Sequence, residues 1–373
     1  MKKLSVFFSS ALLLLTSCGD AVSPFNFSGK IEGVSSDTLL LYYSDVHTGK
    51  WFAVDTVPMV NGCFETTVPD SIMLEISLAA KRRYNSKEGQ IVGDQVYFFP
   101  GDRMQLKGYM PFGVEASGTA LYDGLAKYDD YVQFTKRLAA IETEINATDD
   151  DAQEDSLYDI SDRLTDSLNT VKFNMIKAEP NTDMAGFLSL DLSPEIGVEA
   201  MKRLTEEVKQ GAFSDLIAEA AEGYQRDIDV AKAAQAIQPD CVAPDFKLPG
   251  LDGKEKTLAD FRGKYVVLDF WGTWCGWCIA GIPQMKTYYK KYQKQVEFVG
   301  ICSFDTEEKW RAAVAKHEIP WVNLLDNEVT DVVKTYGISG FPTKIIIDGQ
   351  GKIVAVFEGE SEEFYAKLDA MFK

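Results

Sequence analysis

Histidine is scarce in this chain of 373 residues, which contains only two, and basic residues are in deficit. Lys and Arg number 38 against 57 Asp and Glu, a formal net charge of -19. Such a charge repels polyanions, so we expect neither nucleic acid nor an anionic lipid surface as a partner. Long apolar runs are also lacking: the most apolar stretch, Leu4 to Leu15, has 12 residues. A transmembrane helix needs about 20, so this stretch is too short to span a bilayer.

The first residues instead have the character of a targeting segment. Lys2 and Lys3 precede the apolar stretch, which ends in Leu15-Thr16-Ser17-Cys18. That ending resembles the bacterial lipobox, and the resemblance implies a signal peptide over residues 1–17 and a lipidated Cys18. Residues 18–24 would then be a tether, and the protein would lie in the cell envelope, anchored by lipid and facing the periplasm, with the outer membrane favoured over the inner. The alternative is a plain secretory signal in which Cys18 is incidental.

Residues 25–112 have the pattern of strands. Apolar and polar residues alternate from Phe25 to Ile31, and Asn61-Gly62 is a strong signal for a tight hairpin turn. We predict a small antiparallel β domain here. It resembles the all-β domain that precedes thioredoxin domains in many Bacteroidetes lipoproteins, and it shows no site: His47 and Cys63 are isolated.

Residues 113–238 change to helical periodicity and carry most of the acidity. Between 115 and 240 there are 27 acidic and 11 basic residues, which is typical of a solvated helical segment. Asp149-Asp150-Asp151 interrupts the helical pattern, and Pro180 and Pro194 punctuate it. We expect a helical connecting region without readable chemistry.

Residues 239–373 alternate strands with helices, which indicates an α/β domain. Its chemistry centres on Cys275-Gly276-Trp277-Cys278, where the first cysteine lies at the start of a predicted helix. Two cysteines one turn apart can form a disulfide. Free N–H groups and the helix dipole favour the Cys275 thiolate, so we expect Cys275 to attack and Cys278 to resolve the mixed disulfide.

Zinc binding is the first alternative for this motif, because zinc sites use the same spacing. The remaining candidate ligands are Cys241, Cys302, His47 and His317, and none of them is paired at ligand spacing. We therefore expect no metal and no cofactor. We expect Cys302, at a strand end, to be a buried core thiol and Cys241 to be free.

Further motifs give the domain a specific resemblance. It resembles the TlpA/ResA-type thioredoxin-fold thiol-disulfide oxidoreductases over residues 241–373. The residues that carry the resemblance are the strand Val266–Trp271 leading into the cysteines, Pro283, Gly340-Phe341-Pro342-Thr343, Ala243-Pro244-Asp245-Phe246, Asp252-Gly253-Lys254 and Phe261-Arg262-Gly263-Lys264.

The resemblance implies roles for particular residues. Phe341-Pro342 would be a cis peptide beside the sulfurs, and Asp269 a buried carboxylate that takes the proton of Cys278. The alternative for Asp269 is a strand-end residue satisfied by solvent. The expected substrate-contacting residues are Trp274, Gly276, Trp277, Phe341 and Pro342.

Two positions depart from the family pattern. Gly281 stands where many ResA-like proteins carry Glu, which leaves proton handling to Asp269 alone, and Trp277 stands where Pro is usual. The predicted function is a membrane-tethered oxidoreductase, chiefly a reductase, that exchanges disulfides with exported proteins and is recharged by a membrane thiol donor. An isomerase or oxidase using the same motif is the alternative, because an aromatic before the second cysteine is similar to periplasmic disulfide isomerases.

Two other readings are weaker. Peroxiredoxins share the fold, but their Pro-x-x-x-Thr-x-x-Cys pattern would need Pro and Thr where Leu268 and Gly272 stand. A lipid-anchored binding module with an idle thioredoxin domain would not need both cysteines, Asp269 and Pro342.

Overall fold

The computed structural model describes residues 25–34, 36–84, 87–148, 150–326 and 331–372. The predicted signal peptide, the tether and Cys18 lie outside these ranges. Contacts divide the chain into two compact units, residues 1–187 with 206–216 and residues 188–205 with 217–373. This division falls inside the helical region rather than at residue 238, so the end of that region groups with the last domain.

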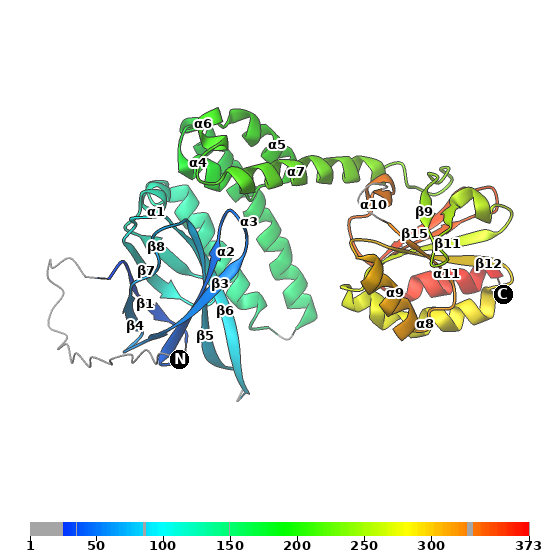
Figure 1. The fold of residues 1–373 in the computed structure, drawn as a ribbon, viewed down its shortest axis with the longest axis horizontal. Helices are drawn as coiled ribbons and strands as arrows, with labels where there is room; N and C mark the ends of the chain where they lie inside the picture. Colours follow the sequence, from blue (N-terminus) through cyan, green and yellow to red (C-terminus); the bar gives the residue numbers. More distant parts are fainter. Residues whose placement is uncertain (1–24, 35, 85–86, 149, 327–330, 373) are drawn as a thin grey trace, which may run out of the picture. The chain divides into compact units, whose positions relative to one another are not determined.

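The first unit begins with two four-stranded sheets (Figure 1). One has the strand order β4-β1-β7-β8 and the other β3-β2-β5-β6. The pairings are antiparallel except for β1 and β7, which run parallel. The strands are β1 (Phe27–Glu32), β2 (Thr38–Asp45), β3 (Trp51–Pro58), β4 (Cys63–Thr66), β5 (Leu74–Tyr84), β6 (Lys87–Phe98), β7 (Met104–Tyr109) and β8 (Val114–Ser117).

Alternation along these strands builds one apolar core. Leu39, Leu41 and Tyr43 of β2 are buried and pack with Phe27 of β1 and Phe98 of β6. Strand β8 extends the β region past residue 112, where we expected it to end, because its backbone pairs with β7.

The predicted turn at Asn61-Gly62 is present, with φ of 53° and 78° and a bridge between Val60 and Cys63. The strands on either side, β3 and β4, belong to different sheets. The turn therefore passes the chain from one sheet to the other instead of closing a hairpin within one sheet.

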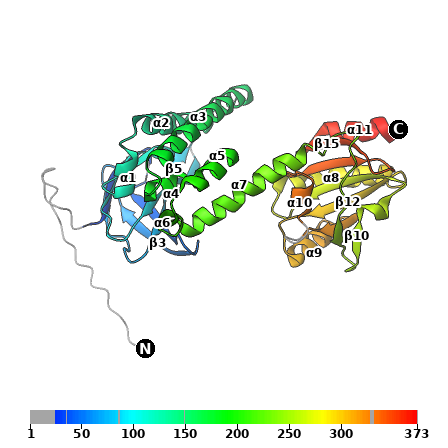
Figure 2. The same ribbon diagram turned by 90° about the horizontal axis from the view of Figure 1, so that it is seen from above.

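Seven helices follow in the described part of the chain, and α2 and α3 run side by side (Figure 2). Asp150 of the acidic triplet caps the start of α3, where its carboxylate accepts from the Gln153 N–H at 2.9 Å. Within the described ranges, no helix has the length and apolar character that a bilayer span requires. The helices are α1 (Ala120–Leu125), α2 (Asp129–Ile145), α3 (Asp151–Ala178), α4 (Asp183–Leu188), α5 (Pro194–Arg203), α6 (Glu206–Lys209) and α7 (Ser214–Ala234).

The C-terminal domain is built on a five-stranded mixed sheet in the order β13-β12-β11-β14-β15. Strands β11, β12 and β13 are parallel to one another, and β14 and β15 are antiparallel additions. This confirms the predicted thioredoxin fold. Its elements are β9 (Lys247–Pro249), β10 (Glu255–Thr257), the 3₁₀ helix η1 (Leu258–Phe261), β11 (Tyr265–Trp271), α8 (Gly276–Tyr292), β12 (Val296–Cys302), α9 (Glu307–Lys316), β13 (Val322–Leu325), α10 (Val332–Thr335), β14 (Thr343–Ile347), β15 (Ile353–Glu358) and α11 (Glu362–Phe372).

The central strand β11 is buried on both faces, as expected of a strand inside an α/β sheet. Val267 and Trp271 pack into a core with residues of α8, α9 and α11, whereas Leu268 and Phe270 pack into the core on the α10 side. Because side chains alternate along a strand, Asp269 faces the same side as Val267 and Trp271. This is the side on which α8 carries both cysteines.

Candidate active site

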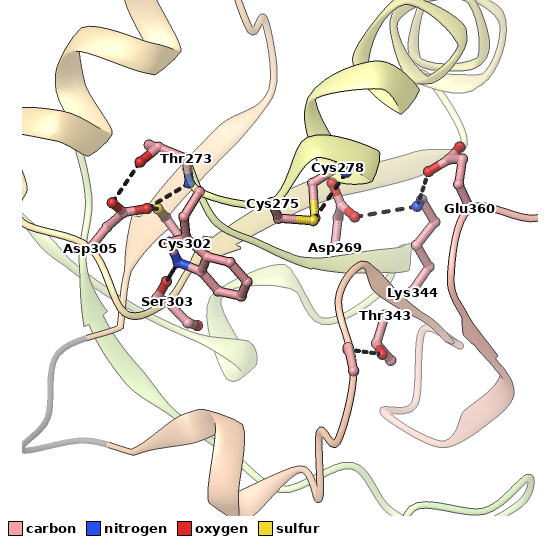
Figure 3. The surroundings of a disulfide bond; sticks show 12 residues. Asp269, Thr273, Cys275, Cys278, Cys302, Ser303, Asp305, Thr343, Lys344 and Glu360 are labelled. Carbon is pink, nitrogen blue, oxygen red and sulfur yellow. Dashed lines mark hydrogen bonds and ion pairs between the residues drawn. A yellow bond between two sulfur atoms is a disulfide. The ribbon is translucent and has the colours of Figure 1, made fainter. Parts of the chain in front are cut away.

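Cys275 and Cys278 form a disulfide at the start of α8 (Figure 3). Cys275 is the N-cap residue, and its Sγ accepts a hydrogen bond from the Cys278 N–H at 3.1 Å. The two residues are only 7% and 6% exposed. The N-terminal end of a helix favours an anion, so the geometry stabilises a Cys275 thiolate once the disulfide is reduced.

Contacts to the strand ends fix the turn between β11 and α8. Gly272 leaves no room for a side chain, because a Cβ there would collide with the indole ring of Trp274. The Trp274 Nε1–H donates to the backbone carbonyl of Ser303 at 3.2 Å. The first cysteine is therefore held through the residues that precede it.

Asp305 holds the same turn from the other side. Its carboxylate accepts from the Thr273 backbone N–H and hydroxyl, both at 2.7 Å, and from the Cys302 thiol at 3.3 Å. Burial, followed by the nearby Asp305 charge, raises the pKa of the Cys302 thiol. Cys302 is a buried free thiol with its proton held by a carboxylate, so it is not a second nucleophile.

Asp269 lies on β11 opposite Lys344 of β14. Lys344 Nζ is 3.7 Å from Asp269 Oδ1 and 2.7 Å from Glu360 Oε2. Burial raises the pKa of Asp269, the Lys344 charge opposes this shift, and the Glu360 charge adds to it. A carboxyl group that holds its proton above the ordinary range can exchange protons with a thiol near neutral pH.

Glu360, in the connection between β15 and α11, brings a second carboxylate to this side of the sheet. Its Oε1 accepts from the Tyr365 hydroxyl at 2.6 Å. Its carboxylate fills the space beside Gly281, where a Cβ would collide with it. Position 281 thus has no acid of its own, but a carboxylate from elsewhere in the chain occupies its surroundings.

The loop before β14 contains the Phe341-Pro342 cis peptide. The Thr343 hydroxyl donates to the Gly340 carbonyl at 2.7 Å, and the Phe341 ring meets the Trp274 ring edge-on at a centroid distance of 5.1 Å. The structure therefore brings the cis-proline loop into contact with the turn that carries the cysteines.

Three aromatic side chains near the disulfide are exposed: Trp274 at 53%, Trp277 at 74% and Phe304 at 55%. Phe304 lies 5.9 Å from Phe341 between ring centroids. With Arg226 of α7 and residues around 337–341, Phe304 and Phe341 also line a groove of about 650 Å³. Exposed apolar rings that lie together on a surface are typical of interaction sites.

Most of the sequence-based site residues lie close to the disulfide. The structure brings together Cys275, Cys278, Asp269, Trp274, Phe341 and Pro342, and it leaves Trp277 facing solvent. Gly276, the first helical residue, has open space around its Cα. Cys18 lies outside the described residues.

Sequence reasoning missed Lys344, Glu360 and Asp305. Lys344 had a signal, since it is a charged residue inside the apolar strand Thr343–Ile347 and must have a partner when buried. Glu360 and Asp305 lie in ordinary polar loops, where nothing in the sequence distinguishes them. Among the described residues, no group of three or more His, Cys, Asp or Glu side chains is placed to hold a metal ion.

The chain is similar to known proteins over its C-terminal domain. The AhpC/TSA family matches residues 239–356. The thiol-disulfide oxidoreductase ResA of Bacillus thuringiensis subsp. konkukian is 35% identical over 132 residues, covering 34% of this chain and 76% of the relative. ResA of Bacillus subtilis is 32% identical over 130 residues, covering 35% of this chain and 72% of the relative.

Among solved structures, the thioredoxin domain of a thiol-disulfide oxidoreductase from Bacteroides vulgatus is 31% identical. The match covers 36% of this chain and 99% of that domain, with a TM-score of 0.35.

The fold and the paired cysteines define a thioredoxin-fold thiol-disulfide oxidoreductase, an enzyme whose substrates are thiols or disulfides. Within that class, the chain belongs to the ResA family.

Proposed function

We propose that this enzyme is tethered to the cell envelope and reduces disulfides in exported proteins through Cys275 and Cys278. The observation that carries the proposal is the pairing of these two sulfurs at the N-terminal end of α8, with Asp269 on the same side of the sheet. Disulfides persist in proteins that have been exported from the cytosol, so substrates are available there. The lipobox-like sequence ending in Cys18 supports a lipid anchor.

In this mechanism the reduced Cys275 thiolate attacks one sulfur of a substrate disulfide. A bond forms between Cys275 and that sulfur, and the other substrate sulfur leaves as a thiolate. Cys278 then attacks Cys275, passes its proton to Asp269, and releases the first substrate sulfur. The substrate is reduced by two electrons, and the enzyme is left as the Cys275–Cys278 disulfide.

A thiol donor at the membrane would return the enzyme to its reduced state. The Phe341-Pro342 loop and the rings of Trp274 and Trp277 would contact the substrate chain, since they surround the disulfide and two of the three are more than half exposed.

A disulfide isomerase or oxidase is the second candidate, favoured by the exposed Trp277 directly before the second cysteine. The residues between the two cysteines are one determinant of the reduction potential, which ranges from about -270 to about -120 mV among thioredoxin-fold proteins. Equilibration of the Cys275–Cys278 pair with glutathione separates these functions, because a reductase has the more negative potential.

The test of the exchange function is Cys278→Ser in the native compartment. Without the resolving thiol, mixed disulfides through Cys275 should accumulate and can be identified after non-reducing electrophoresis. The matched control is Cys275→Ser/Cys278→Ser, which should trap nothing. If Cys278→Ser also traps nothing, the protein does not exchange disulfides, and a binding module with an idle thioredoxin domain is favoured instead.

The lipid anchor has a separate test. Palmitate labelling of the wild-type chain should be lost in Cys18→Ala, and labelling that persists would contradict the anchor.

A further inference from the structure

Two carboxyl groups share one lysine on the cysteine-bearing side of the sheet. Figure 3 shows Lys344 between Asp269 and Glu360. The side chains of Asp269, Lys344 and Glu360 are 14%, 2% and 18% exposed. A buried cation is stable only when its charge is compensated. Two acids therefore compete for a single ammonium group.

Distances show which acid holds the lysine. The 2.7 Å contact between Lys344 Nζ and Glu360 Oε2 is a charge-assisted hydrogen bond. The 3.7 Å separation from Asp269 Oδ1 is too long for one. Within the described part of the chain, this Oδ1 atom is buried and has no hydrogen-bond partner. Lys344 is thus committed to Glu360, and Asp269 receives only a weaker, more distant attraction.

Glu360 is itself fixed in place. Tyr365 donates to one of its oxygens and Lys344 to the other. The absence of a side chain at Gly281 provides the space for the carboxylate. The position that holds the lysine away from Asp269 is therefore built by three different elements: α8, β14 and α11.

We propose that Glu360 is a positioning residue for the exchange reaction, which by holding Lys344 limits the stabilisation of the Asp269 carboxylate and so sets the pH at which Asp269 accepts the Cys278 proton. This inference rests on the proposed function. In the step concerned, Cys278 forms a bond to Cys275, the bond from Cys275 to the leaving sulfur breaks, and that sulfur departs as a thiolate. The proton of Cys278 passes to the Asp269 carboxylate.

The groups that face Asp269 come from every element around it. They are Lys344 from β14, Glu360 from the loop after β15, Tyr365 from α11 through Glu360, and the two cysteines from α8. Its neighbour on β12, Gly300, carries no charge. Burial is the largest cause of the raised pKa of Asp269, and Lys344 is the cation whose charge opposes it, so the position of Lys344 modulates this pKa.

The experiment measures the resolving step directly. The reduced full chain, with Cys18, Cys63 and Cys241 replaced by Ser, is mixed with 5,5′-dithiobis(2-nitrobenzoate). Attack by Cys275 releases the first thionitrobenzoate, and attack by Cys278 releases the second. The rate of the second release is followed in a stopped-flow instrument as a function of pH.

Two substitutions should move this pH profile in opposite directions. Glu360→Gln frees Lys344 to pair with Asp269, so the midpoint of the rise in rate should move to lower pH. Lys344→Met removes the cation, so the midpoint should move to higher pH. A merely structural role would not give shifts of opposite sign. Glu363→Gln, an exposed acid on the same helix as Tyr365, is the control and should leave the midpoint in place.

Gly281→Ala provides a variant that changes no titratable group and keeps the test open if Lys344→Met does not fold. The added Cβ displaces the Glu360 carboxylate, so the midpoint should move in the same direction as in Glu360→Gln. Unchanged midpoints in Glu360→Gln and Gly281→Ala, or shifts of one sign in Glu360→Gln and Lys344→Met, would overturn the inference. The proposed function fails separately, if the parent protein releases only one thionitrobenzoate.

Discussion

The carboxylate of Asp305 accepts two hydrogen bonds from Thr273, one from its backbone N–H and one from its hydroxyl, each at 2.7 Å. Thr273 lies two residues before Cys275, the nucleophile of the proposed mechanism, whereas Asp305 follows the neighbouring strand β12. The turn that presents Cys275 is thus secured by a residue 32 positions further along the chain.

Replacement of Asp305 by Ala should destabilise this domain and slow the reaction. The substitution leaves the Thr273 N–H and hydroxyl and the Cys302 thiol without their acceptor, which costs about 1–3 kcal/mol of unfolding free energy. Denaturant unfolding monitored by tryptophan fluorescence measures the loss. Glu308→Ala, an exposed acid on α9, is the control and should stay within about 0.5 kcal/mol of wild type. Equal stabilities of the two variants would show that the Asp305 contacts carry no net energy.

Asp269→Asn should raise the stability of the oxidised protein and lower the activity of the enzyme. Burial raises the pKa of Asp269 above its ordinary 3.8, so from that pH upward the folded protein holds a proton that the unfolded chain has released. Wild-type stability therefore falls as pH rises through this window, and the asparagine variant escapes that loss. Its gain in unfolding free energy over wild type should grow as the pH rises above 3.8.

The same variant should release substrate slowly, because Cys278 loses its proton acceptor, by about 10²-fold if Asp269 acts as a general base. Asp240→Asn, an exposed substitution of the same kind, should change neither property. A stability gain that does not vary with pH would mean that folding does not raise the pKa of Asp269.

Trp277→Ala should weaken the binding of protein substrates and leave the reaction with small disulfides unchanged. An indole that is 74% exposed beside the disulfide has apolar surface to offer a polypeptide but little to offer a small aromatic disulfide. We expect KM for reduced-and-reoxidised protein substrates to rise about 5- to 30-fold, which corresponds to about 1–2 kcal/mol of binding, with kcat little changed. Trp51→Ala, which removes an exposed indole from β3, is the matched control. An equal effect on dithiobis(nitrobenzoate) would assign Trp277 to the chemistry rather than to binding.

Local sequence signals predicted most of the C-terminal domain because each of its elements is locally consistent. Strand β11 follows an apolar run and ends at the residue predicted, Trp271. Helix α8 begins at Gly276, directly after the cysteine at which we placed the start of the predicted helix. The short strands β9 and β10 escaped prediction, since three residues each are too few to show a period. In the β domain the tight turn was predictable, but the placing of β3 and β4 in different sheets was not, because that choice depends on long-range pairing.

The charge cluster shows the same limit at the active site. Asp269 could be proposed from the family resemblance, because it lies on the strand that leads into the cysteines. Glu360 is 91 residues from Asp269 in sequence, and its loop carries no motif. Only the folded chain shows that the Glu360 carboxylate occupies the space left by the missing side chain at Gly281. From the sequence, Gly281 indicated a missing acid. In the structure, the missing side chain at Gly281 leaves the space in which the Glu360 carboxylate packs.

Helix α11 contributes Tyr365, which holds Glu360 at 2.6 Å. Helix α11 is therefore linked through Glu360 and Lys344 to Asp269, which lies on the side of the sheet that carries the disulfide. A purification tag or reporter fused to the carboxyl end is usually regarded as harmless, but one that disturbed this helix would displace Glu360 and change the charge around Asp269. Activities measured on such fusions need an untagged reference.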